Sequence, residues 1–192
     1  MEIELIEPDC YYHIYNRGIN RQPIFNSEAH YYKFLTLCQF YIPKIADVLA
    51  YCLLPNHFHF LLYIHPDGVP PPRRGVCVNS PLCNLFNAYA QWFNKQSDRT
   101  GGLFQRPFKR KKITDQEYLR QLIYYIHRNP MHHKITGDPT KYPYSSFTGI
   151  VSNQPTFLQR NLVLEWFDSR ENFIDFHLRQ YEIFAESMLE DC

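Results

Sequence analysis

Two histidines separated by one residue, His57 and His59, are the first candidates for chemistry in this sequence. They begin a short apolar and aromatic run that ends at Ile64, for which we expect a β-strand. Side chains alternate between the faces of a strand, so the two imidazoles point the same way, opposite to Phe58 and Phe60. If the phenylalanines face the core, the histidines face an open groove. There, two neutral imidazoles can bind one divalent ion, with a third ligand from elsewhere and positions left for substrate oxygens.

The same histidine pair has two plainer interpretations. A His-x-His pattern on a strand also occurs on an ordinary half-exposed face that binds nothing. Alternatively, the pair could form a structural zinc site with Cys77 and Cys83. No two cysteines have C-x-x-C spacing and the N-terminus is acidic, so we expect reduced cysteines in a cytoplasmic protein without a secretory leader.

A tyrosine and an asparagine, Tyr125 and Asn129, are the second pair of candidates. They follow Gln121 at intervals of four on a predicted helix from Asp115 to Arg128, and form a mostly polar stripe beside its apolar one. An amide oxygen at Asn129 could be the third metal ligand, one turn from the phenol. A phenol has a pKa of about 10, so a nearby divalent cation would be needed to favour the phenolate for attack on a phosphodiester. Most of the 15 tyrosines must be core or rim residues, and Tyr125 can be one of them.

The elements that must position these residues follow from periodicity and turn signals. We expect strands at 10–16, 47–54 and 57–64 and within 103–113, with helices from Ser27 to Pro43, from Ser80, and from a Thr114/Glu117 capping box to a stop at Pro130. The Pro-Asn turn at 55–56 predicts a hairpin. Together they predict an α+β fold, a ferredoxin-like or RRM-like antiparallel sheet with helices packed on one face.

Charge is unevenly distributed along the chain, although the net charge is only +1. Residues 99–112 hold six basic side chains and no acidic one, whereas residues 165–192 hold eight acidic and two basic ones. This pattern fits an anionic partner on one face, and it also fits a solvated hairpin and helix. We divide the chain into a domain at 1–154 and an acidic, helical extension at 155–192. No apolar run approaches the length of a membrane span.

Five segments, taken together and in order, resemble the HUH single-tyrosine transposases, in particular the branch called REP-associated tyrosine transposases. The segments are YYHIYNRG (11–18), LPNHFH (54–59), LFQRPFK (103–109), YIHRNP (125–130) and YSS (144–146). The resemblance covers residues from about 10 to about 150. The proline-rich loop at 66–74 and the extension after 154 have no counterpart in it.

The resemblance implies a transposase that cleaves and rejoins single-stranded, hairpin-forming DNA with Mg²⁺ or Mn²⁺. The tyrosine would join the 5′ phosphate and leave a free 3′ hydroxyl. In this sequence His57 and His59 match the metal ligands and Asn129 the third ligand. Tyr125 matches the nucleophile, and Tyr124 is its near competitor. A homodimer and a monomer are both compatible with the resemblance, as are active sites built in cis or in trans.

The basic segment gains a role under this interpretation, because cationic side chains can neutralise phosphates and aromatic rings can stack on unpaired bases. The expected DNA-binding residues are Arg106, Lys109, Arg110, Lys111, Lys112, Phe104 and Phe108. The alternative from another class is a non-catalytic, single-stranded nucleic-acid-binding module on an RRM-like sheet.

Overall fold

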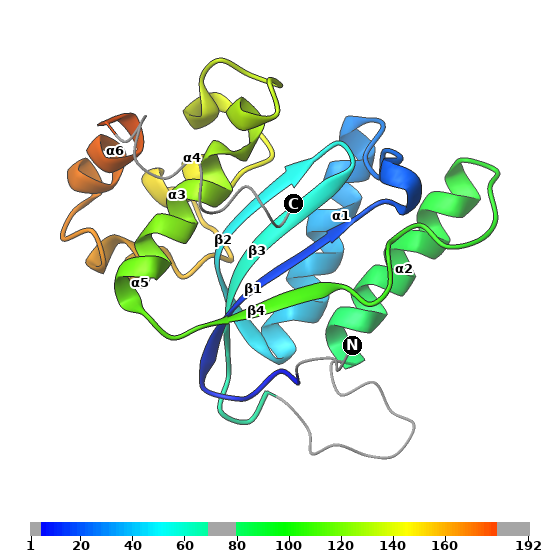
Figure 1. The fold of residues 1–192 in the computed structure, drawn as a ribbon, viewed down its shortest axis with the longest axis horizontal. Helices are drawn as coiled ribbons and strands as arrows, with labels where there is room; N and C mark the ends of the chain where they lie inside the picture. The colour runs from blue at the N-terminus through cyan, green and yellow to red at the C-terminus, as the bar shows by residue number, and fades with distance from the viewer. Residues whose placement is uncertain (1–4, 69–79, 180–192) are drawn as a thin grey trace.

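A four-stranded antiparallel sheet forms the centre of the computed structural model, which describes residues 5–68 and 80–179 (Figure 1). The strands are β1 (Cys10–Arg17), β2 (Ala46–Leu54), β3 (His57–Ile64) and β4 (Lys109–Ile113), in the order β2-β3-β1-β4. The helices are α1 (Glu28–Tyr41), α2 (Ser80–Gln96), α3 (Gln116–His132), α4 (Phe147–Val151), α5 (Arg160–Glu165) and α6 (Arg170–Arg179). As predicted, β2 and β3 form a hairpin around the turn at 55–56.

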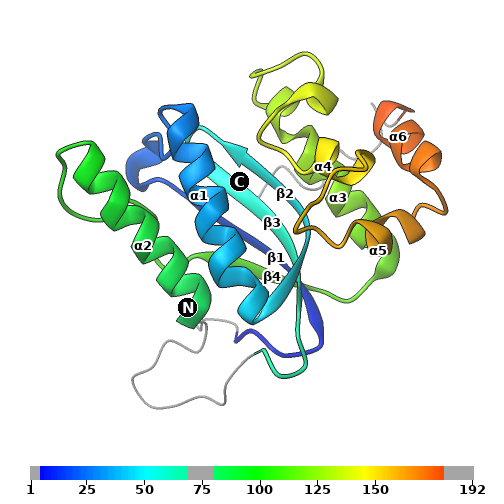
Figure 2. The ribbon, with the colours of Figure 1, turned by 180° about the vertical axis from the view of Figure 1, so that it is seen from behind.

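The two faces of the sheet are covered by different helices. Figure 2 shows α1 and α2 lying side by side across one face. The ring of Phe58 packs there against Phe34 of α1 and Phe86 of α2, with centroids 5.1 and 5.3 Å apart. Helix α3 lies against the opposite face. The predicted α+β fold is confirmed, and the tyrosine helix adds a layer on the second face.

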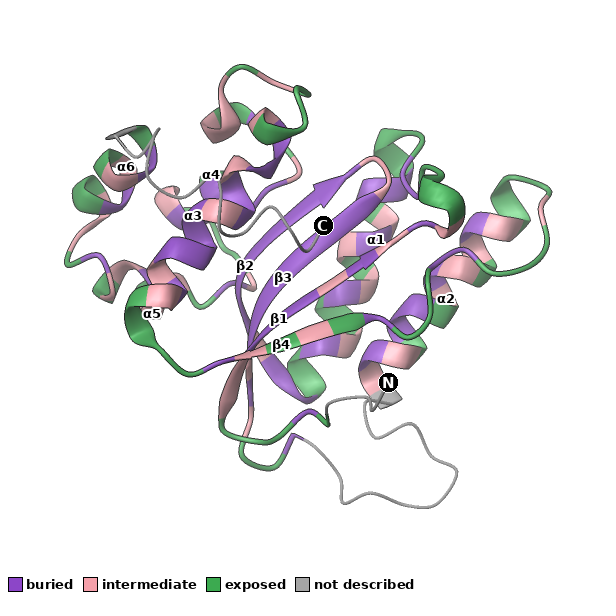
Figure 3. Cartoon of the chain, viewed as in Figure 1, coloured by how far each residue is buried: buried purple, intermediate pink, exposed green. Residues whose placement is uncertain are grey.

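Burial follows this layering. Figure 3 shows β2 and β3 buried along almost their whole length, whereas the first residues of β4 alternate between exposed and half-buried. The central strands therefore carry apolar side chains on both faces, and polar groups among them are removed from solvent. The histidines of β3 are such groups.

Both predicted ends of the tyrosine helix need correction. The N-cap is Asp115, not Thr114, because the Asp115 carboxylate accepts the backbone N–H groups of Glu117 and Tyr118. Pro130 does not end the helix, which continues to His132. A proline in the last turn removes one N–H group but does not prevent the following residues from bonding backwards. The amide of His133 accordingly donates to the carbonyl of Asn129 at 2.9 Å.

The segment from 155 to 179 packs against β2 at its start and against α3 further on. Leu158 forms a parallel bridge with Val48 of β2, and the amide of Gln159 donates to the carbonyl of Val48 at 2.9 Å. The guanidinium of Arg120 on α3 donates to the carbonyl of Trp166. The domain boundary at 154/155 stays a prediction, and residues 180–192 lie outside the described part of the chain, as does most of the proline-rich loop.

Three of the described cysteines, at positions 10, 38 and 52, are free thiols. Cys83 is disulfide-bonded, so the expectation of reduced cysteines is wrong at this position. The sequence pattern missed it because disulfides depend on spatial proximity and need no fixed spacing. None of the described helices combines the length and apolar character needed to cross a membrane.

Candidate active site

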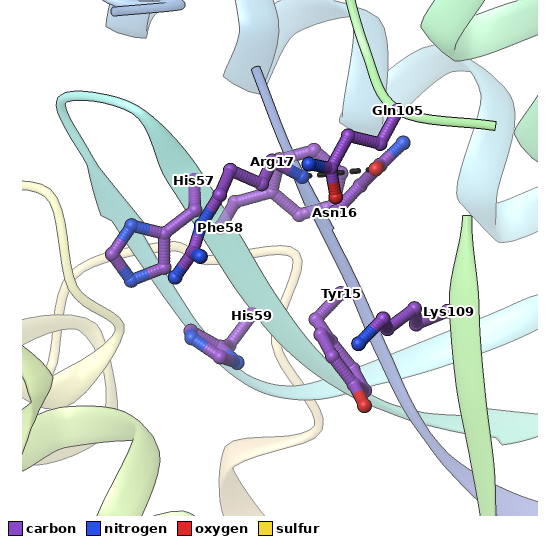
Figure 4. Close-up of a pocket in the computed structure, with 8 residues that line it drawn as sticks. All are labelled: Tyr15, Asn16, Arg17, His57, Phe58, His59, Gln105 and Lys109. Atoms are coloured by element: carbon purple, nitrogen blue, oxygen red, sulfur yellow. Dashed lines mark hydrogen bonds between the residues drawn. The ribbon is translucent and has the colours of Figure 1, made fainter. Parts of the chain in front are cut away.

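The two histidines of β3 lie side by side on the face of the sheet that α3 covers. Their ring centroids are 5.3 Å apart, and His57 and His59 are only 4% and 1% exposed. The shared face is as predicted, but the open groove is wrong, because α3 packs over these strands. What remains is a small pocket of about 40 Å³, drawn in Figure 4, where His57 lies beside Arg17, and His59 lies on the side of Tyr15 and Lys109.

The hydrogen bonds of His57 determine which of its nitrogens is free to bind a ligand. Its Nδ1 lies 2.6 Å from Oδ1 of Asn56, and the Asn56 amide is oriented because its Nδ2 donates to the carbonyl of Arg21 at 3.2 Å. An amide oxygen only accepts hydrogen bonds, so Nδ1 of His57 carries the proton. The lone pair of the neutral ring is therefore on Nε2.

His59 is held in a similar way by a histidine that the sequence interpretation missed. Nδ1 of His59 lies 2.9 Å from Nε2 of His13 on β1, and both rings are buried. Among the described residues, no hydrogen-bond partner reaches Nε2 of either His57 or His59. Burial lowers the pKa of His57 to about 3 and that of His59 well below its usual value, so both rings are neutral at pH 7.

Helix α3 presents the predicted tyrosine stripe to these imidazoles. The ring of Tyr125 lies edge-on to His59 with centroids 5.7 Å apart, and His133, two turns later, lies 4.7 Å from His57. Asn129 is midway between them and 1% exposed. Its Nδ2 donates to the carbonyl of Tyr125 at 2.8 Å, and no partner for its Oδ1 exists in the described part of the chain.

This set of atoms fits a divalent metal ion. Two imidazole nitrogens and one amide oxygen are buried and uncharged, carry lone pairs, and have no protein donor within residues 5–68 and 80–179. Buried polar atoms without partners are rare in proteins and indicate an ion or water that completes them. A pocket of about 40 Å³ exceeds the volume that one water needs, so an ion with substrate oxygen or water can be accommodated. Oε1 of Gln121 also has no partner among the described residues. Gln121 lies one turn before Tyr125 on α3, whereas Asn129 lies one turn after it, towards His133 and His57.

The alternative of a structural zinc site, formed by the histidine pair with Cys77 and Cys83, gains no support from the described residues. No group of three His, Cys, Asp or Glu side chains with metal-binding geometry occurs within the described residues. Cys83 is disulfide-bonded and cannot supply a thiolate, and Cys77 lies outside the described residues. Two imidazoles and one amide oxygen leave coordination positions open, as a catalytic metal requires, whereas a structural zinc is closed by four protein ligands.

The two adjacent tyrosines of α3 point in different directions. Tyr124 is 5% exposed and packs edge-on against Phe176 and His177 of α6, with the guanidinium of Arg128 over its ring. The ring of Tyr125 lies against His59 of β3 instead. Of the two candidates for the nucleophile, Tyr125 is the one beside the proposed metal ligands.

The basic segment does not form one surface. The register pairs Lys109 with Tyr15 and Lys111 with His13, so both lysines belong to the histidine face of the sheet. Lys112 points the other way, and its Nζ lies 2.6 Å from a carboxylate oxygen of Glu7. The alternation of strand β4 therefore separates side chains that the sequence interpretation grouped together.

Two further basic residues lie on the α2 side of the sheet. The guanidinium of Arg110 is 4.1 Å from the ring centroid of Phe108, and Arg106 donates to Oδ1 of Asn87 at 3.2 Å. Both line a groove of about 880 Å³ between α2 and residues 101–110. Cationic residues therefore occur both at the histidine face and in this separate groove.

Phe104 and Phe108 are not the exposed rings that we expected. They are 6% and 7% exposed, and Phe104 packs in the core against Phe58 and Tyr89 at centroid distances of 5.9 and 6.0 Å. Only parts of them border the groove beside α2. Tyr15 is better placed to contact a base: it is half-buried, lines the histidine pocket, and stacks with His59 at an interplanar angle of 21°. The sequence could have indicated this position, because Tyr15 lies two residues from both His13 and Arg17 on one strand and so shares their face.

Comparisons with known proteins bear on the fold and on the family resemblance. No family model matches the chain. A protein of Haemophilus influenzae described as a REP-associated tyrosine transposase is 29% identical over 103 residues, which are 53% of this chain and 58% of that protein. A solved structure of a REP-associated tyrosine transposase bound to a REP hairpin superposes with a TM-score of 0.58, covering 81% of this chain and 88% of the other at 16% identity. The resemblance to the REP-associated tyrosine transposases is confirmed.

The extent of the likeness differs between the two comparisons. The chain spans little more than half the length of the H. influenzae transposase. At 16% identity, the solved REP-associated tyrosine transposase shows that the fold is shared over most of both chains.

Proposed function

We propose that this chain is a DNA transposase that cleaves and rejoins single-stranded DNA through a covalent 5′-phosphotyrosine intermediate. One observation carries the proposal. Three buried polar atoms, on His57, His59 and Asn129, have no partner in the described residues, and the ring of Tyr125, one turn before Asn129, lies edge-on to His59 with centroids 5.7 Å apart. The relatives described above, one of them bound to a DNA hairpin, support a hairpin-forming strand as the substrate.

Each residue has a specific role in this proposal. Nε2 of His57, Nε2 of His59 and Oδ1 of Asn129 would hold Mg²⁺ or Mn²⁺. The bound ion would withdraw charge from the phosphodiester and favour the phenolate over the phenol. Asn56 holds the proton of His57 on Nδ1, and His13 would do the same for His59 with its own Nε2 as the acceptor, as acceptors around metal-binding histidines generally do.

The chemical step is an in-line displacement at phosphorus. The Tyr125 oxygen forms a bond to the phosphorus as the bond to the 3′ oxygen breaks, and the leaving oxygen takes up a proton to become a 3′ hydroxyl. The strand is rejoined when a 3′ hydroxyl attacks the phosphotyrosine and releases Tyr125. Lys109 and Lys111, on the same face, would neutralise phosphates beside the scissile one, with Tyr15 against a base.

The active site is assembled in cis in this proposal. Tyr125 and His59 of one chain are already in contact, so a second copy need not supply the tyrosine helix. We therefore expect a monomer to complete the covalent step, and a homodimer to be needed only if two DNA ends are held together. An enzyme with this substrate would act in the cytoplasm.

The decisive experiment uses end-labelled, single-stranded hairpin DNA from the flanks of the gene. The protein is incubated with it and Mn²⁺ or Mg²⁺, and a protein-linked band is sought on a denaturing gel. We expect a band that disappears with chelator and in Tyr125→Phe. Tyr124→Phe is the matched control: it removes the neighbouring hydroxyl, which faces α6, and should keep the band.

Two outcomes would contradict the proposal. Hairpin binding without any covalent band, with either metal, would favour a non-catalytic nucleic-acid-binding module on the same sheet. A band that survives Tyr125→Phe but is lost in Tyr124→Phe would reassign the nucleophile.

A further inference from the structure

A buried histidine lies on the back of the tyrosine helix and takes no part in the chemistry proposed above. His127 is two residues from both Tyr125 and Asn129, which places it about 200° around the helix from each. It is 1% exposed. Its Nε2 lies 2.7 Å from Oγ of Ser146, and its Nδ1 lies 2.9 Å from Nε2 of His177 on α6.

The directions of these hydrogen bonds can be assigned from one end. Nδ1 of His177 lies 2.8 Å from the carbonyl oxygen of Phe173, which only accepts, so His177 carries its proton there. Burial lowers the pKa of His177 to about 4, so its ring is neutral at pH 7. Nε2 of His177 must then accept from Nδ1 of His127, and Nε2 of His127 accepts from the hydroxyl of Ser146.

Ser146 connects this chain of bonds to the sheet. Its Oγ accepts the backbone N–H of Tyr51 on β2 at 2.8 Å, and its backbone N–H donates to the carbonyl of Tyr51 at 2.9 Å. The longer 3.3 Å contact from Oγ to that carbonyl competes less well for the hydroxyl proton. The next residue of β2, Cys52, pairs directly with His59. The back of the tyrosine helix is thus tied to the strand adjoining the histidine strand.

We propose that His177 and Ser146 are positioning residues that fix the rotation of α3 about its axis through His127, and so aim Tyr125 and Asn129 at the histidine pair. The inference rests on the proposed function. It gives helix α6 a role: His177 supplies the acceptor that completes the link, without belonging to the metal or DNA site proposed above.

The geometry shows why a small rotation matters. Side-chain ends lie about 5–6 Å from a helix axis, so a rotation of about 10° moves the Asn129 oxygen by about 1 Å. Metal-ligand distances tolerate only about 0.2 Å. A displacement of about 1 Å at reacting groups can reduce a rate on the order of 100-fold.

The test compares two substitutions of one residue. His177→Leu removes the acceptor for His127, whereas His177→Gln can keep an acceptor oxygen at a similar place. We expect His177→Leu to lower both the Mn²⁺ affinity, measured by calorimetry, and the single-turnover rate of covalent linkage by roughly 10- to 100-fold. Hairpin affinity should not change, and His177→Gln should recover most of the loss.

A control separates positioning from general destabilisation. His30→Leu removes another buried histidine, on α1, whose Nδ1 accepts the amide of Asn26 at 3.1 Å. At a temperature where all variants are folded, it should keep Mn²⁺ affinity and linkage rate. If His177→Leu does not fold, Ser146→Ala provides the second variant, because it removes the hydroxyl that donates a hydrogen bond to His127.

Several results would overturn the inference. One is a wild-type Mn²⁺ affinity and linkage rate in folded His177→Leu or Ser146→Ala. Another is an equal loss of affinity and rate in His177→Leu and His177→Gln. The third is the same loss of affinity and rate in His30→Leu. Absence of linkage in the wild-type protein would refute the proposed function instead. The Mn²⁺ titrations would then still decide whether His177 positions the Asn129 side of the site.

Discussion

His13 is the residue whose replacement should most directly reveal how the histidine pair is prepared for a metal. It is 7% exposed, and its Nε2 is the hydrogen-bond partner of Nδ1 of His59. His13→Phe keeps a ring of similar size, which can still stack on Tyr15, where the present centroid distance is 4.7 Å. The substitution removes the acceptor while leaving most of the packing in place.

Two magnitudes follow from the loss of this acceptor. With the proton of His59 on Nδ1, as the proposed function requires, this N–H would be buried and unpaired in the variant, which costs about 1–3 kcal/mol of folding free energy. For a chain of this length that corresponds to a decrease in Tm of roughly 2–12 °C. Because the ring of His59 is no longer held in one tautomer and orientation, the metal affinity should fall by about 10- to 100-fold.

The assay is a Mn²⁺ titration by calorimetry at pH 7, with thermal unfolding measured on the same samples. His65→Phe is the control, since His65 follows β3 and its ring lies 3.2 Å from a carboxylate oxygen of Asp47, outside the lining of the pocket. The control should bind Mn²⁺ like the wild type. Wild-type Mn²⁺ affinity in folded His13→Phe would refute the assignment of His59 Nε2 as a ligand held by His13.

Three other predictions concern neighbouring parts of the structure. Asn129→Ala should lower Mn²⁺ affinity at least tenfold, as measured by calorimetry, whereas Gln121→Ala should not; equal effects would mean that the third ligand is wrongly chosen. Lys111→Ala should weaken hairpin binding and reduce the slope of log K against log salt by about 0.7–0.9, whereas Lys112→Ala, whose lysine is paired with Glu7, should change it less; anisotropy titrations at several salt concentrations decide this. The pKa of His177 is lowered to about 4 on folding, so the unfolded protein binds more protons than the folded one between about pH 6.5 and 4. The free energy of unfolding should therefore decrease as the pH falls through this range, by at most about 1.4 kcal/mol per pH unit for this residue. Urea denaturation at pH 7 and pH 5 should show a smaller decrease in His177→Gln, and an unchanged decrease would contradict the assignment.

Local backbone periodicity was sufficient to predict several parts of the site. The strand at 57–64 begins and ends where expected, and its alternation places His57 and His59 on one face and Phe58 on the other. The four-residue spacing of Tyr125 and Asn129 places them on one side of α3. These relations hold because a strand repeats every two residues and a helix every 3.6, whatever packs around them.

What covers each face was decided only by the tertiary structure. His13 and His59 are 46 residues apart, and His127 and His177 are 50 apart, and nothing in their local sequence indicates that their rings meet. Contacts of this kind depend on how complete elements pack, since sequence spacing constrains only neighbours within a turn or a strand pair.

The same reason explains the predictions that failed. The lysines and arginines of residues 106–112 are contiguous in sequence, but strand pairing divides them between two faces, and the ring of Phe104 is taken into the core beside α2. Tyr124 and Tyr125 are indistinguishable by residue type, and only the packing of α6 against one and of β3 against the other separates them. The sequence by itself determined which residues are candidates for the chemistry and which way they point along each element; the packing of distant elements decided which of them meet.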